Sequence, residues 1–140
     1  MSRWIVICVF LFCISLSALG EDGYSGEKKV IMDMIETMET YSVAMADAET
    51  TIQVAEANNE LSDNLEVFAP RMKEMSSEHP EWGESPPDEI QPLIVRYMEV
   101  FTVFNNESLK KALDYANTYM EDQELQDSFK RLNMVIMKLY

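Results

Sequence analysis

The chain has 140 residues, of which 47% are hydrophobic and 26% charged, and its formal net charge is −14. This length is typical of one domain, while the apolar content excludes a disordered chain and the charge content excludes a membrane bundle. The negative charge argues against nucleic-acid binding and against docking on anionic lipid, because both need an excess of Lys and Arg.

The first 20 residues have the pattern of an export signal. Arg3 precedes an almost wholly apolar stretch, residues 4–16, and small residues follow at Ala18 and Gly20. This pattern predicts a signal peptide cleaved after Gly20. A permanent transmembrane helix is the alternative, but the apolar run is shorter than the about 20 residues that a span needs. We therefore expect an exported protein, periplasmic or extracellular, with no stable membrane anchor after cleavage.

The rest of the chain has the composition of a helical domain. Both cysteines, Cys8 and Cys13, lie in the signal segment, so disulfides, thiolate metal sites and cysteine nucleophiles are excluded from residues 21–140. Residues 21–26 are expected to be a flexible leader. Residues 27–140, the predicted helical domain, contain one glycine, and so few turn-forming residues argue against a multi-stranded sheet.

Apolar residues at helical spacing predict two consecutive helices in the first half of this domain. The first begins near Glu27, and Asp47 is expected to cap the second at about Ala48. The seam of the second helix, in which only Asn58 is polar, is expected to pack against neighbouring helices at shallow angles. Pro70 lies opposite this seam and should bend the helix without ending it. The two stripes are Ile31, Met34, Ile35, Met38, Tyr41, Ser42 and Met45, and then Val54, Asn58, Leu61, Leu65, Phe68, Met72 and Met75.

A proline-rich segment, residues 79–87, predicts the one substantial loop. Ser85, with Asp88 three residues later, is expected to cap the third helix. Beyond Asn106 the apolar stripe shifts around the axis, so either this helix kinks or a new helix starts. The last helix is expected to begin near Asp122. The stripes are Ile90, Leu93, Tyr97, Val100, Phe101 and Phe104, then Leu109, Ala112, Leu113, Ala116 and Met120, and finally Leu125, Phe129, Leu132, Ile136 and Leu139.

Four such stripes, joined mostly by short connections, predict an all-α fold, an up-down four-helix bundle after the cleaved signal peptide. A chain of this size buries roughly two-thirds of its unfolded surface, which is enough for stability without disulfides.

Methionine is the outlier in the composition, with 11 residues. Thioethers are soft ligands that select Cu(I), although most of these residues fall on the stripes, where Met fills gaps in a core. Met32, Met134 and Met137 fall off the stripes. They suit an adaptable contact surface or, as the candidate metal ligands, the capture of copper. No other cofactor is expected.

Two residues of the proline-rich loop have side chains that often act in binding sites. His79, the only histidine, stands beside Glu78 and Glu81, and a solvated side chain is favoured over a ligand or a catalytic base. Trp82 is either an exposed anchor for a protein partner or a lid over one end of the bundle, which is the favoured interpretation.

The remaining patterns favour binding over catalysis. Four carboxylates, Glu49, Glu56, Glu60 and Asp63, fall on the outer face of the second helix, where a solvated face is favoured over a site for cations or a basic partner. The common catalytic motifs GxSxG, HExxH, GxGxxG and the P-loop are absent.

The sequence therefore predicts a non-enzymatic protein that binds an unknown protein partner or forms a homo-oligomer. The expected contacts are Trp82 and the off-stripe methionines. The alternative is a Met-rich Cu(I)/Ag(I)-binding protein, and a cofactor-free enzyme is the least favoured class.

Overall fold

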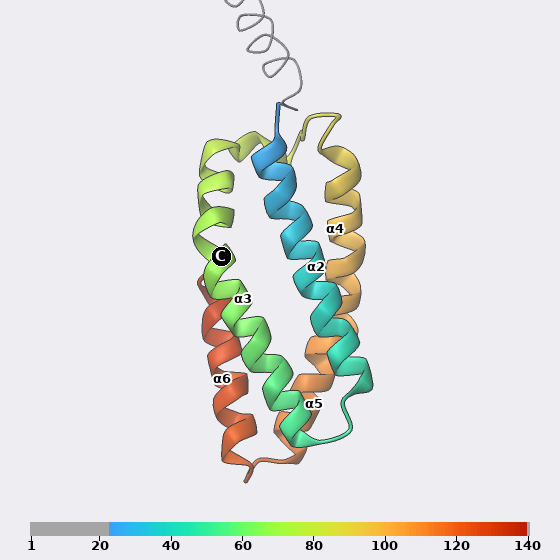
Figure 1. Cartoon of the computed structure of the whole chain (residues 1–140), viewed down its shortest axis with the longest axis vertical. Coiled ribbons are helices and arrows are strands. Elements are labelled where there is room, and N and C mark those ends of the chain that lie inside the picture. Colours follow the sequence, from blue (N-terminus) through green and yellow to red (C-terminus); the bar gives the residue numbers. More distant parts are fainter. Residues whose placement is uncertain (1–22, 140) are drawn as a thin grey trace, which may run out of the picture.

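The computed structural model describes residues 23–139, which form an up-down bundle of helices (Figure 1). The predicted signal segment and the first two residues of the predicted leader lie outside the described residues. Within residues 23–139, no helix combines the length and the apolar character needed to cross a bilayer. The helices are α2 (Ser25–Asp47), α3 (Thr51–Glu78), α4 (Gln91–Val103), α5 (Lys110–Thr118) and α6 (Gln123–Met137), with a 3-10 helix η1 (Pro80–Gly83) and a π-helical segment η2 (Phe104–Leu109).

The segments α4, η2 and α5 follow one another without a break, so they form one long helix. With α2, α3 and α6 it makes the four-helix bundle that the sequence predicts. Helix α2 packs against α3 and α4, and α6 packs against α3 and α5. Pro70 lies inside α3 on an exposed face, and the helix continues past it as expected.

Helix α2 begins at Ser25, two residues before the expected start. The preceding residue, Tyr24, packs the edge of its ring against Trp82, with 5.2 Å between the ring centroids. The described part of the predicted flexible leader is therefore included in the fold, because an aromatic contact holds it against the bundle.

The cap of α3 is Thr50, and the expected cap at Asp47 is wrong because Asp47 still belongs to α2. The Thr50 hydroxyl accepts a hydrogen bond from the Gln53 backbone N–H at 3.3 Å. In return, the Gln53 side-chain oxygen accepts from the Thr50 backbone N–H at 3.2 Å. This is a capping box, which satisfies two backbone donors at the start of the helix.

The starts of α4 and α6 differ in how well the sequence predicts them. No side chain caps α4, which begins at Gln91 with a proline in its first turn, so the expected cap at Ser85 is wrong. The backbone N–H of Gln91 donates instead to the Pro87 carbonyl, at 3.0 Å. At α6 the expected start near Asp122 is confirmed, since the helix begins at Gln123. The Asp122 carboxylate caps it by accepting from the Leu125 backbone N–H at 3.1 Å.

The π-helical segment η2 explains why the apolar stripe shifts near Asn106. A π turn contains about one residue more than an α turn, so every later side chain is rotated around the axis. Ser108 consequently lies in the core. Two residues of the expected stripe are exposed: Leu113 within α5, and Met120, which lies beyond the end of α5 at Thr118.

The main core contains a short chain of buried polar groups. The Tyr41 hydroxyl donates to the Asn58 side-chain oxygen at 2.9 Å, and the Asn58 amide donates to the Ser128 hydroxyl at 3.2 Å. Ser128 in turn donates to the Leu125 carbonyl at 2.8 Å. Burial raises the pKa of Tyr41 above its ordinary range, so its hydroxyl stays protonated and remains a donor. These bonds fix the register of α2, α3 and α6 relative to one another.

The two ends of the bundle are built differently, because α6 is much shorter than α3 (Figure 1). Leu139, just after α6, lines the same pocket as Leu65 in the middle of α3. Beyond that level α3 continues for three further turns without α6 beside it. The α3 seam is buried up to Leu65 and only half-buried at Phe68, Met72 and Met75.

Candidate functional site

Helix α4 presents an apolar surface to solvent. Only Arg96 and Glu99 are charged among its 13 residues, yet none of the 13 is buried. Val95 is 58% exposed and Met98 53% exposed. The surface named here the α4 face comprises the exposed Val95, Met98 and Thr102 and the half-buried Ile94 and Phe101.

An apolar pocket of about 170 Å³ opens beside the α4 face, at the level where α6 ends. It receives residues from α2, α3, α4, η2 and the end of α6. Tyr97 and Phe101 form its α4 wall, and Leu139 closes it on the α6 side. A pocket of this kind next to an exposed apolar surface is typical of the places where an anchor side chain of a partner inserts.

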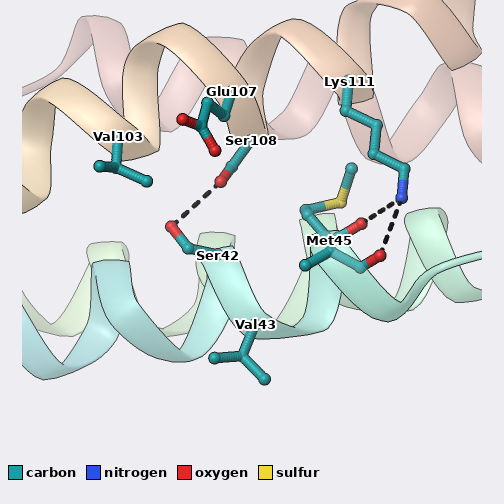
Figure 2. A pocket seen from close by; sticks show the side chains of 8 residues that line it. Ser42, Val43, Met45, Val103, Glu107, Ser108 and Lys111 are labelled. Atoms are coloured by element: carbon teal, nitrogen blue, oxygen red, sulfur yellow. Dashed lines mark hydrogen bonds between the residues drawn. The ribbon is translucent and has the colours of Figure 1, made fainter.

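A second hollow, of about 350 Å³, lies between α2 and the η2–α5 segment (Figure 2). On its floor the Ser108 hydroxyl, from the π-helical turn, donates to Ser42 at 3.0 Å. Lys111 reaches across to the end of α2 and donates to the backbone carbonyls of Met45, Ala46 and Ala48.

This second hollow has little capacity for chemistry. An ammonium group has three N–H donors. In Lys111 all three are used by the carbonyls at the end of α2. The contact satisfies carbonyls that have no partner within the helix and places a positive charge at the negative end of α2. Lys111 therefore acts as a C-terminal cap that ties α5 to α2, and its ammonium is not available to attract an anionic ligand.

Trp82 is a lid. It is 9% exposed and belongs to a second, smaller core cluster with Ile31, Ile35 and Ile90. Because its ring is buried at the end of the bundle, Trp82 is not an exposed anchor for a partner. The alternative prediction of an exposed anchor is therefore wrong.

His79 is held in place, and the expected solvated side chain is wrong. Its ring stacks on Trp82 with 4.1 Å between the centroids and an angle of 14° between the planes. It is half-buried at the end of α3, where its Nε2 lies 3.1 Å from a Glu27 carboxylate oxygen and its Nδ1 lies 3.6 Å from that of Glu81.

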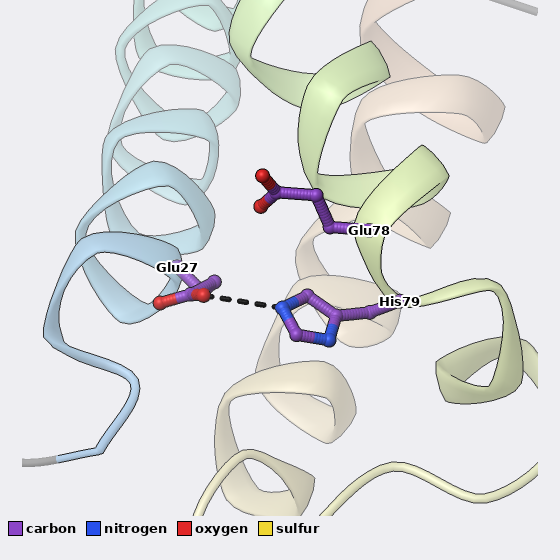
Figure 3. A group of neighbouring side chains, drawn as sticks. All are labelled: Glu27, Glu78 and His79. Atoms are coloured by element: carbon purple, nitrogen blue, oxygen red, sulfur yellow. Dashed lines mark hydrogen bonds and ion pairs between the residues drawn. The ribbon is translucent and has the colours of Figure 1, made fainter.

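Glu27, Glu78 and His79 form the cluster shown in Figure 3, in which the start of α2 meets the end of α3. One ligand atom from each side chain lies within 4.8 Å of the other two. A hydrogen bond from its own backbone N–H, and next the contact with His79, hold the pKa of Glu27 below its ordinary value. Glu27 is therefore ionised at neutral pH.

The structure does not gather the three candidate metal-binding methionines into one site. Met32 lines a hollow between α2 and α4. Met134 and Met137 lie one turn apart on α6, a helix that packs against α3 and α5. All three side chains are exposed, as their off-stripe positions predict.

The acidic face of α3 is solvated as predicted. Glu56, Glu60 and Asp63 are exposed on α3, whereas Glu49, also exposed, lies in the connection before α3, so its predicted place on the helix is wrong. Arg131 of α6 binds Asp63 at 2.6 Å and Glu66 at 3.0 Å. These contacts are exposed ion pairs, which contribute little to stability.

Comparison of the chain with protein-family models, with curated proteins and with solved structures finds no match.

Two features of the surface are not predicted by the apolar stripes. The core stripe predicted for α4 leaves out Val95 and Met98, and only two charges occur in the helix. That low charge in a chain with 26% charged residues is the signal that could have revealed the α4 face. The hydrogen bond between Glu27 and His79 leaves no local pattern in the sequence, because 52 positions separate the two residues.

Proposed function

We propose that this is an exported protein that acts by binding another protein chain through the α4 face, and that it is not an enzyme. The observation that carries the proposal is that α4 has only two charged residues, of opposite sign, among 13 and no buried residue. A helix of this composition normally buries one face. A charge-depleted apolar surface is also typical of the central part of a protein interface.

The surroundings of the α4 face support this interpretation. The apolar pocket beside it offers a place for one large side chain of the partner. Phe68 and Met72 on α3 are half-buried and face the same end of the bundle, where α6 does not reach. A partner helix lying there would cover apolar groups of both α3 and α4, in the manner of a helix bound in a groove.

Charge bears on which partner the surface accepts. The chain carries a net charge of −14, so two copies repel one another at a distance. The α4 face itself has one Arg and one Glu close by, Arg96 and Glu99, so this surface adds no repulsion of its own. A helical segment of a less acidic protein is therefore the favoured partner, and a second copy of the chain is the alternative outcome.

The test is site-specific photo-crosslinking in the cells that make the protein. A photoreactive residue replaces Met98 in one variant and Ile52 of α3 in the matched control. Ile52 is 59% exposed, close to the 53% of Met98. We expect a discrete adduct from position 98 and none from position 52, and the adduct mass separates a foreign partner from a second copy. Absence of an adduct at position 98, or the same adducts at both positions, would contradict the proposal.

The Cu(I)/Ag(I) alternative is supported by one observation, the pair of exposed thioethers of Met134 and Met137 on α6. Their spacing of three residues places them on the same side of the helix, where together they offer two soft ligands. Titration of Cu(I) against a competing chelator tests this alternative. Binding that disappears when both residues are changed to Leu would support it, whereas binding no tighter than micromolar would remove it.

A further inference from the structure

We propose that Glu27, Glu78 and His79 form a binding site for one zinc ion that joins the start of α2 to the end of α3. The cluster lies at the Trp82 end of the bundle, and Figure 3 shows how its side chains lie between the two helices. The proposal concerns a different class of ligand, and it does not depend on the α4 face.

The spacing of the donor atoms fits this ion after a small movement. Zinc binds imidazole nitrogen and carboxylate oxygen at about 2.0–2.2 Å with tetrahedral geometry, which separates neighbouring ligand atoms by about 3.4 Å. Glu27 and His79 Nε2 are 3.1 Å apart, close to this separation. Glu78 lies within 4.8 Å of both ligand atoms and is exposed, so its side chain is free to turn inward. Three protein ligands would leave the fourth position to water.

The His79 ring is oriented as a metal ligand requires. Its stacking on Trp82 fixes the plane of the ring. Its Nδ1 faces the Glu81 carboxylate at 3.6 Å, while its Nε2 points toward Glu27. In the metal-free chain Nε2 is engaged by its hydrogen bond to Glu27 at 3.1 Å. Zinc would replace the proton of this hydrogen bond, and a proton on Nδ1, facing Glu81, would then give the outer carboxylate that is usual around zinc-bound histidines.

The local charge also favours a cation. Glu78 lies in the last turn of α3, at the negative end of the helix, and that turn has no basic residue. A carboxylate in this position is unfavourable, and a divalent ion beside it would compensate both the carboxylate and the helix end. The imidazole and carboxylate ligands suit zinc and not Cu(I), which prefers thioethers, so this site is separate from the methionine alternative.

Zinc titration of the metal-free full-length chain tests the proposal, with affinity measured against a chromogenic chelator. We expect one ion per chain and release of protons on binding, because the metal competes with protons for the imidazole. The informative variant is Glu78→Gln, since this exposed side chain supports no described contact with the core and its loss should leave the fold intact. We expect Glu78→Gln to weaken binding at least tenfold. The matched control Glu74→Gln, an exposed residue one turn earlier with the same change of charge, should bind zinc as the parent does.

The single histidine supplies a second readout. Because the chain has one histidine, its ring nitrogen signals in an NMR spectrum belong to His79 without assignment. Zinc should shift the Nε2 signal strongly and leave Nδ1 protonated. Absence of saturable one-to-one binding would overturn the proposal. Equal affinities of Glu78→Gln and Glu74→Gln, or ring signals that do not move at saturating zinc, would overturn it as well.

Discussion

Trp82 closes one end of the bundle by packing between His79, Tyr24 and the isoleucines beneath it. Its indole ring is the largest apolar group of the smaller core cluster, so removing it leaves a cavity that the loop cannot fill. We expect Trp82→Ala to lower the free energy of unfolding by about 3 kcal/mol or more, measured by chemical denaturation. Trp82→Phe should cost clearly less, because a ring remains in place. Unchanged stability of Trp82→Ala would show that the ring is not part of the core.

Asn58 is the centre of the buried polar chain, and its truncation removes the partners of two other buried groups. In Asn58→Ala the Tyr41 hydroxyl and the Ser128 hydroxyl each lose a hydrogen bond. We expect a loss of about 2–3 kcal/mol in the free energy of unfolding, from unsatisfied polar groups and a small cavity. The control Asn133→Ala, at an exposed position of α6, should change stability little. Similar losses in both variants would contradict this role of Asn58.

At the scale of the helices, the cap of α3 gives a clear comparison between two neighbouring residues. Thr50→Ala removes the side-chain acceptor for the Gln53 backbone N–H, and we expect it to cost about 1 kcal/mol. Asp47→Ala is the matched control, because Asp47 ends α2 and makes no part of this capping box. Thermal unfolding of the two variants decides between the caps. A larger loss in Asp47→Ala would favour the cap expected from the sequence.

The π-helical turn predicts an unusual tolerance of a deletion. Removing Asn106 takes out the one extra residue of η2, so an ordinary α-helix can continue from α4 into α5 with Ala112 and Ala116 still facing the core. We expect this deletion to leave the chain folded with a modest loss of stability, by circular dichroism and thermal unfolding. Deletion of Lys130, in the regular helix α6, rotates the residues that follow it and should unfold the chain. Unfolding by both deletions would contradict the explanation of the turn.

The helices themselves were predictable because apolar side chains at steps of three and four leave a strong periodic signal. The stripe of α2, the buried start of the α3 seam and the start of α6 near Asp122 all follow from it. Residues just outside the periodic segments were less predictable. Thr50 and Asp47 are both good caps by residue type, and only the position at which α2 ends decides between them.

At the scale of the whole molecule, the sequence predicted the bundle. It did not predict that the two ends differ because α6 is shorter than α3. The α4 side chains that line the apolar pocket, Tyr97 and Phe101, are only half-buried because α6 ends level with Leu65. The relation of helix lengths in space cannot be obtained from the period of one helix. The α4 face therefore emerged from the structure, whereas the exposed methionines at positions 32, 134 and 137 were correctly placed outside the core.

The central claim is that the α4 face binds a protein chain. Native mass spectrometry of the protein recovered from the cells that make it measures this most directly, because one spectrum gives the mass of the chain and of everything bound to it. We predict that the parent chain is recovered with a second protein chain, and that Met98→Glu, which places a charge on the α4 face, is recovered alone. Recovery of both the parent and the variant as single chains, with no bound mass larger than an ion, would contradict the claim.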